Sequence, residues 1–356
     1  MKTVTYKGKI LLKDKIVDGY ISIEDGKISY IGKTKPCDDF TTIDGGIIAP
    51  GFIDIHCHTS PNYSAKDNPE EVARFHLSHG TTTMLLSYYR DIPHEQLLEC
   101  LSRTKIAMNT EKNLYGAHLE GPYLNANLGF GTGTNDSPDK SKYSKYVKTG
   151  IVRQWTCAPE IVGIYDFIKD VTDYGIIVAI GHSAATYQQV KTAYDSGAKI
   201  VTHTFDATKA PPTQYGGTLE MDFNESCLLM DDMYYEVICD QKWIHLRKEK
   251  LALLIKTVGI NKIVAITDMS CLDAIDDGLD VNIVDGQLSG TKLTMAKVAT
   301  NLFNAGYNLY DVFKMVSLNP AKALKLNDRG EIDVGKKADL ILIDEKANFK
   351  KLISLS

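Results

Sequence analysis

Short apolar runs of strand length alternate with longer amphipathic runs through the middle of this chain of 356 residues. The alternation predicts repeated strand–helix units, in which successive strands pair in parallel because each helix returns the chain to the same edge of the sheet. The expected strands are 52–58, 81–88, 114–120, 150–157, 175–182, 200–203, 234–240 and 262–268. The expected helices include 69–79, 94–111, 160–172, 187–197, 246–258 and 310–324. Eight parallel strands are the number that closes a (β/α)8 barrel, so we expect an α/β fold of the TIM-barrel type.

The sequence pattern at the two chain ends differs from that of the middle of the chain. Residues 1–48 hold short strand candidates separated by Asp-Gly turns at 25–26 and 44–45, and residues 330–356 have the same pattern. Asp-Gly between apolar runs is typical of tight turns that join antiparallel strands. We therefore expect both ends to join in one small β-sandwich domain, 1–48 plus 330–356, beside a catalytic barrel formed by 49–329.

Composition excludes several classes of protein. A net charge of −5 argues against a nucleic-acid partner, because such domains carry a basic excess on one face. No apolar stretch is long enough for a membrane span, and the first residues lack the apolar segment of a secretion signal. The seven cysteines are odd in number and contain no C-x-x-C pair, which favours reduced, mostly buried thiols. We expect a cytoplasmic protein without a membrane partner.

Polar residues with metal-binding side chains stand at or next to the ends of the predicted strands. The carboxyl ends of barrel strands open on one face, and the two imidazoles of a His-x-His pair lie on the same side of a strand. Neutral imidazole and carboxylate together suit zinc or iron. The pattern predicts a hydrolytic metal centre, and therefore an enzyme. The predicted ligands are His56, His58, Glu120, His182, His203 and Asp268.

Other readings exist for single residues. Asp268 follows a run of branched residues, so it is either a strand stop or the catalytic group above the pocket. His182 and His203, taken alone, are equally well core histidines. His118 lies on the same side of its strand as Glu120, which indicates a packing or supporting role. Three other histidines, His76, His79 and His94, lie on or beside expected surface helices, where solvated side chains are the default.

Several motifs of the chain resemble one known family. The most specific is His-Leu-Glu-Gly-Pro at 118–122, and it is accompanied by the His-x-His segment 50–58, Gly-His-Ser-Ala at 181–184, 202–205, Thr-Asp at 267–268, and the runs 290–295, 316–324 and 335–342. Together they resemble the amidohydrolase superfamily and, within it, the N-acetylglucosamine-6-phosphate deacetylases. The resemblance covers essentially the whole chain.

This resemblance implies a ligand set and a mechanism. Glu120, His182 and His203 would hold one divalent ion, and His56, His58 and Asp268 would help to hold a second in some members. Asp268 would take a proton from the attacking water and return it to the departing amine. The substrate would be an N-acetyl amino sugar, and the partner of each chain a second copy in a homodimer.

The departures from the family fall on the substrate side. Relatives carry a Lys-Lys-Gly-x-His-like segment after His-Leu-Glu-Gly-Pro, whereas residues 125–136 here hold neither a lysine nor a histidine. Asp206 stands where relatives have an asparagine, and Trp243 where they have a histidine. Residues 210–241 contain no lysine or arginine. Phosphate is held best by guanidinium, ammonium or N–H donors, so a phosphate requirement is left open.

Residues expected to contact the substrate are Tyr123, Asp206, Ala207, Trp243 and His245. Phe130 and Tyr215 would add aromatic surface, which suits an uncharged sugar or an acyl group better than a dianion. Lys209, Lys242, His245 or Arg247 would have to rebuild any phosphate site.

Two other functions remain. The chain is either an amidohydrolase that acts on a different amide, such as an N-acyl amino acid or a cyclic amide, or a non-catalytic metal-binding relative. Many hydrolases of the first kind use a carboxylated lysine at the end of the fourth strand, and residues 152–157 contain none. The intact ligand set and Asp268 argue against the second.

Overall fold

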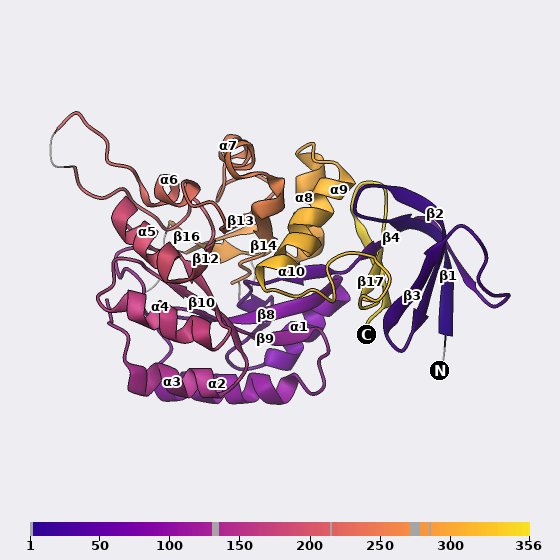
Figure 1. Cartoon of the computed structure of the whole chain (residues 1–356), viewed down its shortest axis with the longest axis horizontal. Coiled ribbons are helices and arrows are strands. Elements are labelled where there is room, and N and C mark those ends of the chain that lie inside the picture. Colours follow the sequence, from indigo (N-terminus) through magenta and orange to yellow (C-terminus); the bar gives the residue numbers. More distant parts are fainter. Residues whose placement is uncertain (1–2, 130–134, 214–215, 271–277, 285) are drawn as a thin grey trace.

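The computed structural model describes residues 3–129, 135–213, 216–270, 278–284 and 286–356. Eight strands form one sheet in the order β14-β13-β12-β11-β10-β9-β8-β5, and every neighbouring pair in it is parallel (Figure 1). The eight predicted strands are all present. Their bounds are β5 Phe52–Asp54, β8 Thr81–Tyr89, β9 Leu114–Glu120, β10 Val152–Cys157, β11 Ile177–Ile180, β12 Ala198–Val201, β13 Tyr234–Ile238 and β14 Ile263–Ile266.

The sheet closes between its first and last strands through a seam of individual hydrogen bonds. The backbone N–H of Asp268 donates to the carbonyl of His56 at 2.9 Å, and the Thr267 hydroxyl donates to Asp54 at 2.6 Å. The N–H of His58 donates to the carbonyl of Met269 at 2.9 Å. These contacts bring the carboxyl ends of β5 and β14 together, so the sheet is barrel-shaped as expected.

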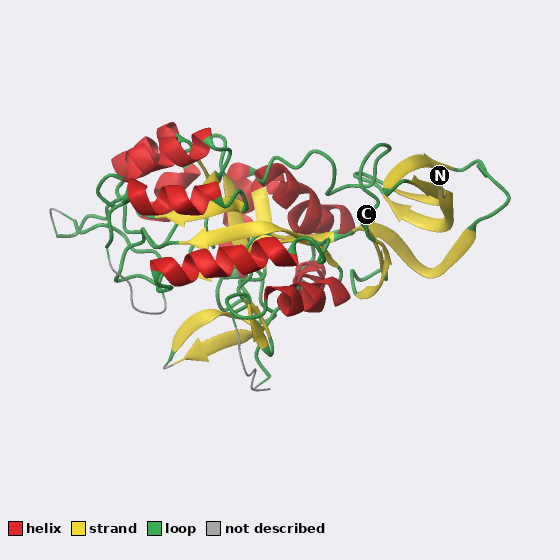
Figure 2. Cartoon of the chain, turned by 90° about the horizontal axis from the view of Figure 1, so that it is seen from below, coloured by secondary structure: helices red, strands yellow, loops and turns green. Residues whose placement is uncertain are grey.

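A helix follows each barrel strand and packs outside it (Figure 2). Helix α5 begins with a capping box between Thr186 and Gln189, which satisfies N–H groups that the first turn leaves unpaired. Three of these helices, α3, α6 and α8, were not predicted from the sequence. The helices are α1 Pro69–Ser78, α2 His94–Ala107, α3 Lys140–Lys148, α4 Ile164–Asp173, α5 Tyr187–Ser196, α6 Phe223–Leu228, α7 Lys248–Val258 with the short η1 Ile260–Lys262, α8 Met295–Asn304, and then α9 Leu309–Phe313, η2 Lys314–Leu318 and α10 Asn319–Ala323.

Both chain ends join in one small β domain, as the sequence predicts. Its six strands hydrogen-bond into a single sheet of order β18-β17-β4-β1-β2-β3, in which β17 from the C-terminal end pairs with β4 from the N-terminal end. The sheet has its own apolar core, which includes Ile10, Ile21, Ile48 and Leu340. The strands are β1 Thr3–Leu11, β2 Ile16–Glu24, β3 Lys27–Gly32, β4 Thr41–Pro50, β17 Leu340–Ile343 and β18 Phe349–Ser354.

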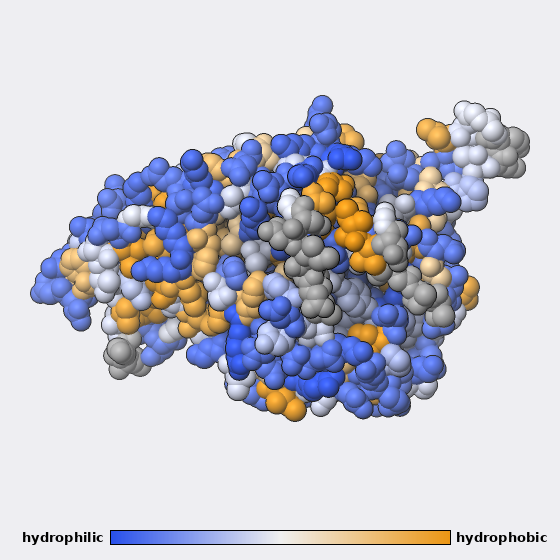
Figure 3. All heavy atoms as spheres, turned by 180° about the vertical axis from the view of Figure 1, so that it is seen from behind, coloured by the Kyte–Doolittle hydropathy of each residue, from blue (hydrophilic) through white to orange (hydrophobic). Residues whose placement is uncertain are grey.

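Two small hairpins complete the structure. They are β6 Thr59–Ser60 with β7 Tyr63–Ser64, and β15 Val281–Val284 with β16 Gln287–Thr291. Within the described residues no helix is long and apolar enough to cross a membrane. The face of the molecule shown in Figure 3 is mainly hydrophilic. Six described cysteines are free thiols, five of them buried as expected, whereas Cys37 is exposed and Cys271 lies outside the described residues.

Candidate metal centre and active-site cavity

The structure brings all six predicted ligands together at the carboxyl ends of the barrel strands. Three of them, one each from the ends of β9, β11 and β12, form one compact group. Glu120 Oε1 lies 2.8 Å from His182 Nε2 and 3.2 Å from His203 Nε2, and the two Nε2 atoms are 2.9 Å apart. Three ligand atoms that converge in this way suit a single divalent ion.

The other three ligands form a second group directly beside the first. His56 Nε2 and His58 Nε2 are 3.2 Å apart, and each lies 3.4 Å from Asp268 Oδ1. Glu120 reaches both groups, because its Oε2 lies 3.2 Å from His58 Nε2. The arrangement therefore offers places for one ion or for two ions that share a carboxylate.

The backbone turns sharply where three of these side chains leave their strands. His182, His203 and Asp268 have φ of 47°, 23° and 46°, in the left-handed region that costs a non-glycine residue on the order of 1 kcal/mol or more. Each residue stands two positions past the end of its strand. We infer that these turns aim the side chains over the barrel axis.

Electrostatics of the metal-free chain show that the centre attracts positive charge. Burial opposes protonation of His56, but the negative charges of Glu120 and Asp268 outweigh it and raise its pKa well above the ordinary value. Burial likewise opposes protonation of His203, yet the hydrogen bond to Glu120 raises its pKa to about 9. The raised pKa values favour protonated imidazoles. An ion would have to displace these protons, so ion binding would release protons and would weaken in acid.

The donor set fits a divalent ion of the zinc or iron type. Two imidazole nitrogens facing each other at 2.9 Å need either a proton or an ion between them. The tautomer of His182 suits an ion. Its Nδ1 donates to the carbonyl of Leu128 at 3.3 Å, so the unprotonated Nε2 faces the centre and can bind a metal. Arg90 Nη1 donates to the same carbonyl at 3.0 Å and so supports the loop that orients His182.

One residue missed by the sequence argument orients His56. Glu236, in the middle of β13, is fully buried, and its Oε2 accepts from His56 Nδ1 at 3.1 Å. Its Oε1 accepts from Gln154 Nε2 at 2.7 Å. Burying a carboxylate costs free energy unless it is paired. A glutamate in the middle of the otherwise apolar strand β13 was therefore the sequence feature that could have indicated a buried partner for Glu236. Glu236 holds His56 with its Nε2 toward the metal centre.

We expect Glu236→Gln to weaken ion binding on the His56 side of the centre. Loss of a carboxylate that supports a ligand histidine typically lowers metal affinity about 10- to 100-fold. Metal titration of the apoprotein should show one weakened step, while the step assigned to Glu120, His182 and His203 is retained. Two unchanged steps would contradict this role for Glu236.

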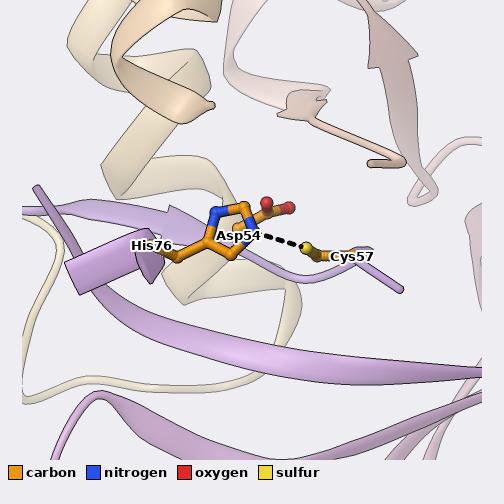
Figure 4. A group of neighbouring side chains, drawn as sticks. All are labelled: Asp54, Cys57 and His76. Atoms are coloured by element: carbon orange, nitrogen blue, oxygen red, sulfur yellow. Dashed lines mark hydrogen bonds between the residues drawn. The ribbon is translucent and has the colours of Figure 1, made fainter. Parts of the chain in front are cut away.

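Behind the His-x-His pair lies a second buried cluster, which ties β5 in place. Cys57 lies beside His76, and its Sγ is 3.1 Å from His76 Nε2 (Figure 4). His76 Nε2 also lies 2.9 Å from the carbonyl of Thr59, and Asp54 accepts the hydroxyl of Thr267. The expectation that His76 is solvated was therefore wrong, since α1 turns it inward and it is fully buried. Its burial lowers its pKa to about 4, so it is neutral.

His118 has the supporting role that was anticipated. It is fully buried and uses both ring nitrogens, Nδ1 with Ser87 at 2.9 Å and Nε2 with Thr156 at 2.8 Å. Its ring packs edge-on against His56, with centroids 4.4 Å apart. His118 thus forms part of the floor below the metal centre.

A cavity of about 400 Å³ opens above the ligands. Besides the ligands it is lined by polar and apolar groups from several loops and from the hairpin β15–β16. Apart from histidine, Arg90 is the cationic residue among the described lining residues. The lining includes Tyr89, Arg90, Asp91, Leu124, Gly129, Asp206, Ala207, Ser270, Asn282, Val284 and Leu288.

The predicted substrate contacts divide into three groups. Asp206 and Ala207 line the cavity. His245 lies behind Asp206, with its Nδ1 2.7 Å from Asp206 Oδ2 and its Nε2 3.1 Å from the carbonyl of Gly290. Both nitrogens face acceptors, so His245 is an imidazolium paired with Asp206. Burial would raise the pKa of Asp206, but the bond from His245 lowers it to about 2.

Two of the predicted contacts lie away from the described cavity lining. Tyr123 is buried in the barrel core, where its ring stacks on Trp155 and packs edge-on against Phe167, so this expectation was wrong. Trp243 is buried as well, and its carbonyl accepts from Arg247 Nη1 at 3.1 Å. Phe130 and Tyr215 lie outside the described residues.

Fold and site together define a metal-dependent hydrolase. The chain belongs to the amidohydrolase family, whose sequence model it matches over residues 47–354. It is therefore an enzyme that hydrolyses amide bonds. It is 26% identical to the N-acetylglucosamine-6-phosphate deacetylase of Lysinibacillus sphaericus, over 91% of this chain and 88% of that protein.

Solved structures of the same kind match the whole chain. The N-acetylglucosamine-6-phosphate deacetylase of Thermotoga maritima superimposes with a TM-score of 0.85 at 28% identity, over 99% of this chain and 98% of that one. The Mycobacterium smegmatis protein of that name, in complex with N-acetyl-D-glucosamine-6-phosphate, gives a TM-score of 0.87 at 23% identity, with the same coverage.

Proposed function

We propose that the chain is a metal-dependent deacetylase of N-acetyl amino sugars for which a 6-phosphate is not required. The observation that carries the proposal is the convergence of six ligand side chains below a cavity of about 400 Å³. A divalent ion held by Glu120, His182 and His203 would activate water and polarise the amide carbonyl. The similarity to the deacetylases supports an acetamido group as the reacting group.

We propose Asp268 as the group that carries the proton. Burial alone would raise its pKa, but the charge of His56 keeps the pKa below the usual value, so the carboxylate is ionised at neutral pH. It lines the cavity and overhangs both groups of ligands. We propose that it accepts a proton from the attacking water and returns it to the amine as the carbon–nitrogen bond breaks, which yields acetate and the free amino sugar.

The walls of the cavity support a neutral sugar rather than a sugar phosphate. They carry the carboxylates of Asp91 and Asp206 beside those of the metal centre, while Arg90 is engaged with the carbonyls of Asn125 and Leu128. His245, which was considered as a phosphate donor, has both ring nitrogens occupied. Lys209, Lys242 and Arg247 are exposed and do not lie among the described lining residues.

Adding a 6-phosphate to an N-acetyl amino sugar should therefore raise kcat/KM by less than about tenfold. Two charge-assisted hydrogen bonds at roughly 1.5–3 kcal/mol each would give a true phosphate pocket a preference of a hundredfold or more. Steady-state deacetylation of matched phosphorylated and free N-acetyl sugars, with N-acetyl amino acids alongside, is the measurement. A preference for the phosphate above about a hundredfold, lost in Arg90→Gln or Lys242→Ala, would overturn the neutral-sugar assignment.

Further features of the enzyme are part of the same proposal. We propose zinc as the ion, because imidazole and carboxylate in tetrahedral sites favour it, with iron as the alternative. A cytoplasmic homodimer is proposed from the similarity to the deacetylases. A relative that hydrolyses an N-acyl amino acid or a cyclic amide is the second candidate, and the substrate panel above distinguishes it.

A further inference from the structure

Tyr89 is the last residue of β8 and stands at the edge of the metal centre. Its ring stacks face to face on the ring of His58, with centroids 3.8 Å apart and planes 1° apart. The residue is 39% exposed and lines the cavity above the ligands. Its side chain is therefore fixed from one side by a metal ligand and accessible to a substrate from the other.

Strand periodicity explains why this tyrosine, and not its neighbour, faces the site. Alternate residues of β8 point to opposite faces, and Ser87 bonds inward to His118. Tyr89 has the same parity as Ser87. Tyr88 faces the surrounding helices, where its hydroxyl donates to the carbonyl of Ala65 at 3.3 Å and contacts Thr104 Oγ1.

The hydroxyl of Tyr89 is available as a donor. It lies near the hydroxyl of Ser270, two residues after Asp268. Ser270 Oγ donates its own hydrogen to the carbonyl of Ser289, so it does not compete as a donor. A phenol remains protonated at neutral pH, where its ordinary pKa is about 10. A substrate oxygen that enters the cavity can accept a hydrogen bond from this phenol.

Amide hydrolysis needs such a donor. Negative charge builds on the carbonyl oxygen as water adds to the carbon, and hydrogen bonds fixed in advance at that position lower the barrier. Two other neutral side-chain donors of the described lining, Ser270 Oγ and Asn282 Nδ2, both donate to the carbonyl of Ser289.

We propose that Tyr89 is a catalytic residue that donates a hydrogen bond to the carbonyl oxygen of the scissile amide. The inference rests on the proposed amide hydrolysis and adds to it the group that stabilises the oxyanion. The phenol donates its hydrogen bond to the substrate oxygen as water adds to the carbonyl carbon. The phenol keeps its proton throughout.

The test is Tyr89→Phe, which keeps the ring stacked on His58 and removes the hydroxyl alone. We expect kcat to fall on the order of a hundredfold with little change in KM and with the metal content of the wild type. A tetrahedral methylphosphonamidate analogue of the N-acetyl sugar should bind about a hundredfold more weakly, whereas the product amino sugar should bind as before. Calorimetry on metal-loaded protein measures both affinities.

Tyr88→Phe is the matched control. It removes a phenolic hydroxyl from the adjacent residue on the opposite face of the strand, so kcat should stay within about twofold of the wild type. Near wild-type kcat in Tyr89→Phe, or a loss of bound metal in that variant, would overturn the proposal. A wild type that hydrolyses no member of the amide panel would instead refute the proposed function.

Discussion

Asp268→Asn should lower kcat on the order of 10²- to 10⁴-fold, the range expected when a general acid–base group is removed. The substitution is close to isosteric, and asparagine tolerates the φ of 46° at this position. An amide can neither accept the proton of the attacking water nor return one to the amine. Steady-state assays of deacetylation with an N-acetyl amino sugar measure kcat for wild type and variant.

Metal analysis of the same variant separates this role from a structural one. The ion between Glu120, His182 and His203 has no ligand changed, so at least one equivalent should remain bound. Turnover near that of the wild type with unchanged metal would show that Asp268 only ends its strand. A loss of both activity and all metal would assign Asp268 to the primary ion instead.

Glu120→Gln should lose most of the bound metal, and activity should fall with it. Glu120 contacts both groups of ligands, and its pKa lies well below the ordinary value because the charge of His56 and the hydrogen bonds from His182 outweigh the effect of burial. The amide keeps the shape of the side chain but removes the charge that favours a cation. Elemental analysis of wild type and variant gives the result directly.

Glu111→Gln is a suitable control for this experiment. Glu111 is also a buried carboxylate, but it pairs with Arg74 at 2.8 Å on the outside of the barrel. Its loss should leave the metal content unchanged. A metal content that is equal in wild type and Glu120→Gln, with activity in both, would reject the proposed ligand set.

The fold and the position of the centre were predictable because both follow from local patterns. Apolar strands such as β11 and β14 are buried on both faces. A polar residue just after such a strand, such as His182 or Asp268, is therefore expected at the carboxyl-terminal rim of the barrel. Helix α3 was not predicted because it lacks an apolar periodic pattern. Four of its nine residues are lysines, and its two buried residues are tyrosines.

Side-chain environments were harder to predict than strand ends. Tyr123 was expected to contact substrate, but it lies among Trp155 and Phe167, two residues far from it in sequence. Glu236 and Tyr89 were missed because their roles depend on partners brought by other strands, His56 from β5 to Glu236 and His58 to Tyr89. Only the closed barrel creates these pairs.

The seam between β5 and β14 links the metal centre to the lifetime of the protein in the cell. The residues that close the barrel there, His56, His58 and Asp268, are also proposed ion ligands, so opening the seam and releasing the ion would be coupled events. An ion present at about a hundred times its dissociation constant adds about 2.7 kcal/mol to the free energy of unfolding. Copies of the chain that lack the ion would open more often and would be degraded first, so the supply of metal would set the abundance of the enzyme as well as its activity.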